Sequence, residues 1–76
     1  MPLIHNRELC RELNPRELRT VELIADGLGN RDIGIQMGFS THSVRQRIHR
    51  IFDKLGFDHR TELALWYVKK KNEGAL

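Results

Sequence analysis

The stretch that most constrains the fold is residues 39–55, FSTHSVRQRIHRIFDKL, which has the spacing and the end signals of one helix. Its apolar side chains recur every three or four residues, so they fall on one stripe of a helix. They are Val44, Ile48, Ile51 and Leu55. Ser40 can cap the start because its hydroxyl accepts a hydrogen bond from a free amide of the first turn. Gly56 predicts the end, since glycine readily adopts the left-handed conformation that closes helices.

The opposite face of this helix is cationic. At about 100° per residue, His42, Gln46 and His49 lie farthest from the apolar stripe, and arginines flank them. Residues 41–54 hold three arginines and Lys54 against Asp53, so their charge of 4 − 1 = +3 equals that of the whole chain. A solvated helix face usually mixes both signs of charge. The concentration of positive charge therefore favours a polyanion as the partner.

Length and composition limit the alternatives. A chain of 76 residues forms one small domain at most and has no room for a deep catalytic cavity. Its 30% charged and 39% hydrophobic residues are typical of a soluble globular domain. The longest apolar run, residues 63–68, is too short to cross a bilayer, and no signal-peptide pattern is present. A single cysteine, Cys10, cannot form an internal disulfide, which favours the reducing cytoplasm.

Three further helices are predicted around the central one. The first begins where Asn14 caps, Pro15 takes the first helical position and Glu17 completes a capping box. It ends at Gly27 or Gly29. Before it, residues 1–12 are predicted to form an arm or a short extra helix.

A helix-turn-helix is predicted next. A short helix starts near Asn30, with either Asn30 or Gly29 as its cap, and runs to about Met37. A glycine-containing turn joins it to the central helix, and this order defines a helix-turn-helix. The prediction is an all-α four-helix bundle spanning residues 13–71.

The last helix is predicted to have Asp58 as its cap and to extend to about Lys71, with residues 72–76 as a frayed tail. It is apolar on more than one side, so it is either deeply buried or contacts a partner. Leu65 and Val68 face away from its inner stripe, which predicts a dimer contact. Trp66, beside them, is assigned either to this contact or to the core.

Several spaced blocks of the chain resemble the LuxR-type (GerE-like) DNA-binding domain. The blocks are residues 13–17, 24–33, 39–45 and 51–57, together with Arg60. The resemblance extends from Leu13 to about Val68. It implies a four-helix domain whose third helix enters the major groove of duplex DNA and whose fourth commonly forms a dimer contact. The implied partners are duplex DNA and, at least on DNA, a second copy of the chain.

The resemblance also assigns site residues by their position in the motif. Base reading is implied for Arg45, Gln46 and His49, and the outward position of His42 adds it to them. Phosphate contacts are implied for Asn30, Ser43, Arg47 and Lys54, and Arg50 is expected to meet phosphate or solvent because it lies farther along the helix. No membrane, cofactor or small-molecule ligand is implied. The expected location is the cytoplasm, in association with the nucleoid.

Three residues depart from the family pattern. Gly29 stands where a serine cap is usual, which should cost only a few tenths of a kcal/mol, roughly. Gly34 stands where alanine is usual and predicts a looser second helix, since glycine costs up to ~1 kcal/mol against alanine. Arg47 stands where histidine is common and should raise non-specific affinity for DNA through its permanent charge.

Metal and enzyme interpretations are disfavoured. His42 and His49 are two helical turns apart, roughly 10.5 Å, which is too far to share an ion. A hydrolase site could be sought in Ser40, His42, Ser43 and Asp53, but they lie along one helix without an oxyanion donor or a pocket, so no catalytic residue is predicted.

Two functional classes stay open. One is a sequence-specific DNA-binding transcriptional regulator, and the other is a small protein-interaction module that pairs with a larger regulator through its fourth helix. The cationic third helix favours the first class, because an interaction module has no use for that charge. A receiver or ligand-binding domain does not fit in this length. The chain is thus either the effector part of a longer regulator or a free-standing one, and its Met1 start favours the latter.

Overall fold

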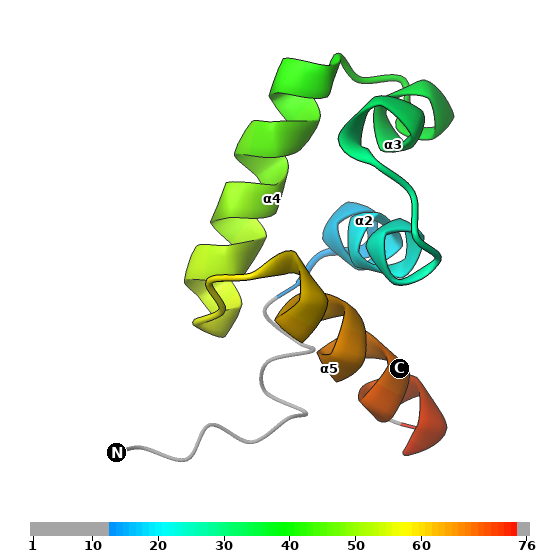
Figure 1. Cartoon of the computed structure of the whole chain (residues 1–76), viewed down its shortest axis with the longest axis vertical. Coiled ribbons are helices and arrows are strands. Elements are labelled where there is room, and N and C mark those ends of the chain that lie inside the picture. Colours follow the sequence, from blue (N-terminus) through cyan, green and yellow to red (C-terminus); the bar gives the residue numbers. More distant parts are fainter. Residues whose placement is uncertain (1–12, 75–76) are drawn as a thin grey trace.

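The computed structural model describes residues 13–74, which form four helices and no strand (Figure 1). The helices are α2 (Pro15–Ala25), α3 (Asn30–Met37), α4 (Thr41–Leu55) and α5 (Arg60–Asn72). The main packing pairs are α2 with α5 and α3 with α4, and α2 also contacts both α3 and α4. The predicted all-α helix-turn-helix fold is therefore confirmed. The arm or short helix expected in residues 1–12 lies outside the described residues.

Side-chain caps start α2 and α4. At α2, Asn14 Oδ1 accepts from the Glu17 amide at 2.8 Å and Glu17 Oε1 accepts from the Asn14 amide at 2.9 Å, so the predicted capping box is confirmed. At α4, Ser40 Oγ accepts from the Ser43 amide at 3.1 Å. Of the two alternatives for α3, Gly29 holds the cap position and Asn30 is the first helical residue.

The start of α5 differs from the sequence prediction. Asp58 is not its cap, because the helix begins at Arg60 with His59 in the cap position. The physical reason is Glu62, whose Oε1 accepts from the His59 amide at 3.2 Å and thereby fixes the first turn one residue later. At the other end, Asn72 belongs to the helix, although it was placed in the frayed tail.

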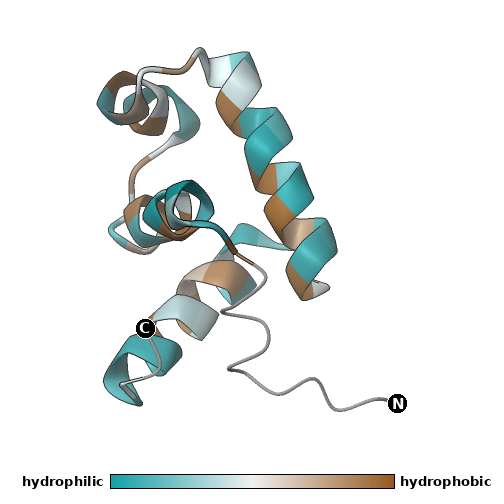
Figure 2. Cartoon of the chain, turned by 180° about the vertical axis from the view of Figure 1, so that it is seen from behind, coloured by the Kyte–Doolittle hydropathy of each residue, from teal (hydrophilic) through white to brown (hydrophobic). Residues whose placement is uncertain are grey.

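The core forms where all four helices meet. Every member of the predicted stripe on α4 is buried, and Leu63 of α5 is fully enclosed. Trp66 is only 8% exposed and its ring meets Phe57 edge-on, with centroids 6.3 Å apart, so it belongs to the core rather than to an outer contact. Figure 2 shows the result on α4, whose ribbon alternates between hydrophobic and hydrophilic segments. The buried apolar residues are Leu13, Val21, Leu23, Ile24, Ile33, Val44, Ile48, Ile51, Leu55, Leu63 and Trp66.

Gly34 has a packing role that the sequence did not reveal. A Cβ atom at this position would lie 2.4 Å from the carbonyl oxygen of Phe39 and 3.5 Å from Val44 Cγ2. The Phe39 amide also donates to the Gly34 carbonyl at 2.8 Å, which draws the turn tightly against α3. Gly34 therefore allows the α3–α4 turn to close, and the looser second helix expected from its low helix propensity stays a prediction.

We predict that Gly34→Ala destabilises the fold although alanine is the better helix former. The new methyl group must push back the Phe39 backbone, and overpacking of this kind costs about 1–3 kcal/mol, more than the ~1 kcal/mol of helix propensity gained. Urea unfolding followed by circular dichroism measures the change in the free energy of unfolding.

Gly29→Ser is the matched control. Gly29 has open space around its Cβ direction, and serine there can cap α3. This variant should gain a few tenths of a kcal/mol, roughly. A Gly34→Ala variant that is more stable than the parent chain would contradict the close approach.

Candidate nucleic-acid interface

The outward face of α4 presents all of the side chains that were predicted to read bases. His42, Arg45, Gln46 and His49 are exposed on the side of α4 opposite the buried stripe. The His49 ring also packs edge-on against Phe52, with centroids 6.3 Å apart and planes at 87°. The face therefore combines one guanidinium, which only donates hydrogen bonds, with one carboxamide and two imidazoles, which in their neutral forms can both donate and accept them.

One flank of this face is an open hollow of about 290 Å³. Arg45 and His49 of α4 line it together with Asn30 at the start of α3 and Arg60 at the start of α5. Arg60 Nη1 donates to Asn30 Oδ1 at 2.6 Å, and its Nη2 donates to the Leu28 carbonyl at 2.7 Å. Because Arg60 occupies the amide oxygen of Asn30, the NH₂ group of Asn30 is the part that can donate to a phosphate.

Partial burial lowers the pKa of Arg60, which nevertheless stays positively charged at neutral pH because guanidinium groups do not lose their proton in proteins. The α5 start thus adds a fixed charge beside the α4 face. The hydrogen bonds of Arg60 also connect α5 to the loop that precedes α3, a connection that the sequence did not predict.

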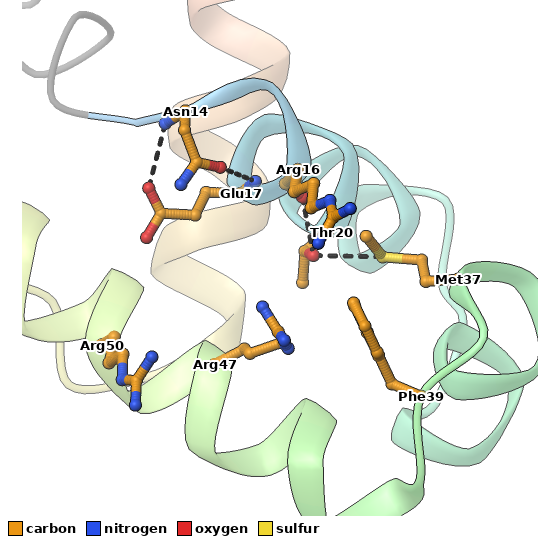
Figure 3. Close-up of a pocket in the computed structure, with 8 residues that line it drawn as sticks. All are labelled: Asn14, Arg16, Glu17, Thr20, Met37, Phe39, Arg47 and Arg50. Carbon is orange, nitrogen blue, oxygen red and sulfur yellow. Dashed lines mark hydrogen bonds between the residues drawn. The ribbon is translucent and has the colours of Figure 1, made fainter.

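The other flank is a small pocket of about 70 Å³ between α2, α4 and the turn before α4 (Figure 3). The guanidinium carbon of Arg47 lies 3.9 Å from the centroid of the Phe39 ring, a cation–π contact. Its Nε is buried and has no hydrogen-bond partner in the described part of the chain. A buried donor without a partner costs about 1–3 kcal/mol. The pocket is lined by Asn14, Arg16, Glu17, Thr20, Met37, Phe39, Arg47 and Arg50.

An ion pair joins α2 to the C-terminal part of α4. Lys54 Nζ donates to Glu17 Oε1 at 2.8 Å. Burial acts to raise the pKa of Glu17, but the Lys54 ammonium, the Asn14 amide and the Arg50 charge outweigh it and hold that pKa below its usual value. The sequence predicts Lys54 as a phosphate contact, and that role stays a prediction. A phosphate would have to compete with Glu17 for the Lys54 ammonium.

The remaining predicted residues, Ser43 and Arg50, lie on the same side of α4 as Arg47. Ser43 is half-buried near the start of α4, where its amide is held by Ser40, and Arg50 is exposed beside the small pocket. Sequence reasoning missed Arg16, which lies on the other side of this pocket. Arg16 lies inside the capping motif formed by Asn14 and Glu17, and no periodicity in the sequence connects it to α4.

Two other properties of the described helices bear on function. Within residues 13–74, no three His, Cys, Asp or Glu side chains gather closely enough to hold a metal ion. No helix in that range has both the length and the apolar character needed to cross a membrane.

Comparison with known families decides the classification of the chain. The sequence model described as "Bacterial regulatory proteins, luxR family" (GerE) matches residues 11–67. The chain belongs to the LuxR family. Domains of this family are DNA-binding parts of transcriptional regulators and not enzymes. The matched range covers α2, α3, α4 and most of α5, so the resemblance seen in the sequence is confirmed.

The chain spans less than a third of the length of each of the following curated relatives. The "Response regulator Rre1" of Synechocystis sp. is 36% identical over 52 residues, which cover 68% of this chain and 22% of that protein. The "Uncharacterized transcriptional regulatory protein YxjL" of Bacillus subtilis is 31% identical over 86% of this chain and 30% of its own length. The "Oxygen regulatory protein NreC" of Staphylococcus aureus is 37% identical over 78% and 27%. No solved structure matches.

We predict that Glu17→Gln lowers the stability of the domain in a pH-dependent way. Because the pKa of Glu17 is lowered in the folded chain, its ionised form contributes stability above the ordinary pKa of 4.5, and that contribution disappears as the pH falls through the lower folded value. At neutral pH the loss should be about 0.2–1 kcal/mol, as for a partly exposed ion pair. Urea unfolding between pH 3 and pH 7 measures it.

Asp53→Asn is the control for this experiment, because it removes one exposed carboxylate from α4 with the same change in net charge. The control should retain the parent's loss of stability in the acid range. Identical pH profiles for Glu17→Gln and the parent would show that the Glu17–Lys54 pair contributes nothing.

Proposed function

We propose that this chain is the sequence-specific DNA-binding part of a bacterial transcriptional regulator and that α4 lies in the major groove. The observation that carries the proposal is that α4 is buried on one side only: its apolar stripe is enclosed, whereas its cationic face is exposed. A major groove about 12 Å wide admits one α-helix. Binding of chromosomal DNA would locate the protein in the cytoplasm, at the nucleoid.

The chemistry of the exposed face suits base reading. Arg45 can donate two hydrogen bonds to guanine, and Gln46 can both donate to and accept from adenine. His42 and His49 offer further donors and acceptors on the same face. Asn30 on one side, and Ser43, Arg47, Arg50 and Lys54 on the other, would then face the two backbones that border the groove.

The first prediction of this proposal is salt-sensitive binding to duplex DNA of random sequence. With roughly four to six phosphates neutralised, the logarithm of the binding constant should fall against the logarithm of salt concentration with a slope of about −4 to −5. Fluorescence anisotropy with a labelled duplex measures it between 50 and 300 mM salt, roughly. A flat response, or no binding at low salt, would favour the protein-interaction module instead.

A second prediction distinguishes side chains that recognise bases from side chains that contact phosphates. Gln46→Ala should relax the preference at one base pair by about 1–3 kcal/mol and leave the salt slope nearly unchanged, because a carboxamide releases no counterions. Selection from a random duplex pool gives the preferred sequences of variant and parent. If both select the same sequence with the same stringency, Gln46 does not read a base and α4 lies in the groove in another rotation.

We further propose that α5 forms a symmetric dimer contact on DNA. Leu65 and Val68 support this, since they are 65% and 46% exposed and lie three residues apart on one side of α5. Trp66 is omitted from the contact because it is buried in the core. Two copies joined here would place their half-sites about one helical turn apart, ~10 bp.

Leu65→Glu tests the dimer contact. A carboxylate at each copy of this position would put like charges across the contact, so the variant should bind a palindromic site with lower affinity and without cooperativity. Sedimentation of the protein with its duplex gives the stoichiometry. Two copies of the variant bound as tightly as two copies of the parent would place the contact elsewhere.

A further inference from the structure

We propose that Arg16, Arg47 and Arg50 form a binding pocket for a phosphate of the DNA backbone. The inference rests on the proposed function and extends it to α2, which would otherwise serve only as support for α4. The three arginines come from two helices and line one pocket of about 70 Å³ (Figure 3). Neither the family resemblance nor any helical spacing assigned Arg16 to the site.

None of the three arginines in this pocket forms an ion pair within the described part of the chain. The ion pairs among residues 13–74 are Arg19–Glu22, Lys54–Glu17 and Lys70–Glu73, and none of them includes Arg16, Arg47 or Arg50. Glu17 is the single carboxylate that lines the pocket, and Lys54 at 2.8 Å offsets its charge. Three guanidinium charges around one hollow repel one another, and an anion between them would relieve that repulsion.

Arg47 is already held in place for such a contact. The Phe39 ring supports the flat face of its guanidinium at 3.9 Å, and Figure 3 shows the side chain extending from α4 into the space in front of α2. Its buried Nε has no hydrogen-bond partner among the described residues. A planar guanidinium with a free edge binds phosphate oxygens through paired hydrogen bonds, and holding it in advance reduces the entropy lost on binding.

The size and place of the pocket select the occupant. Small organic ligands occupy pockets of about 300–1,000 Å³, so this one accepts only a compact group such as the oxygens of one phosphate. Arg47 and Arg50 belong to α4 and stand at the edge of its exposed face. A backbone phosphate bordering the groove occupied by α4 would therefore meet the pocket. Free inorganic phosphate is the other ligand with the same chemistry.

Arg16→Gln is the decisive variant, and Arg19→Gln is its matched control. Both remove one exposed arginine from α2, but Arg19 pairs with Glu22 and does not line the pocket. Arg16→Gln should reduce the salt slope of duplex binding by about one unit and lower affinity at 100 mM salt about five- to tenfold, without changing the selected sequence. Arg19→Gln should keep the parent's slope. Circular dichroism confirms that both variants fold.

Duplexes that carry an uncharged analogue of one phosphate then locate the phosphate that the pocket contacts. In a duplex carrying one methylphosphonate at successive positions, the parent should lose affinity at one position in each half-site, and Arg16→Gln should lose less there, because only Arg47 and Arg50 remain to contact that phosphate. A parent that binds DNA while Arg16→Gln matches it in affinity and slope would overturn the pocket and leave the proposed function intact. A parent that binds no duplex would overturn both. Millimolar inorganic phosphate binding that requires Arg16, with unchanged DNA binding, would also overturn the assignment to the DNA backbone.

Discussion

Burial of the apolar stripe of α4 is the constraint on which the rest of the structure depends. Val44, Ile48, Ile51 and Leu55 are all enclosed, and each buried side chain of this kind contributes about 1.5–3 kcal/mol. In a helix, fixing one stripe inward fixes the opposite stripe outward. The same burial that stabilises the domain therefore determines which face of α4, with its arginine, carboxamide and imidazole groups, meets the surroundings.

Three contacts outside the core connect the elements in and around this helix. Phe39 supports Arg47 on one flank, and the Lys54–Glu17 pair joins the far end of α4 to α2. On the other flank, Arg60 links the starts of α3 and α5 through Asn30. Each contact uses a charged group, so side chains that stabilise the fold lie next to those that would meet phosphate. A compact domain has little surface to divide between these two tasks.

Sequence periodicity and capping predicted α2, α3 and α4 well, because hydrophobic spacing and the Asn14, Ser40 and Gly56 signals are local properties of the chain. Other features depend on contacts that only the folded chain makes. Gly34 depends on the Phe39 carbonyl, which only the folded turn brings close. The same limit applies to the site, whose α4 face followed from spacing, while the approach of Arg16 to Arg47 joins positions 31 residues apart and required the fold.

The central claim is that the exposed face of α4 is the surface that contacts DNA. Backbone amide chemical shifts of the ¹⁵N-labelled chain, recorded with and without a duplex at low salt, test it most directly. The largest changes should fall at His42, Arg45, Gln46 and His49 and in the two flanks beside them. Changes concentrated on the outer face of α5, around Leu65 and Val68, with α4 unaffected, would contradict it.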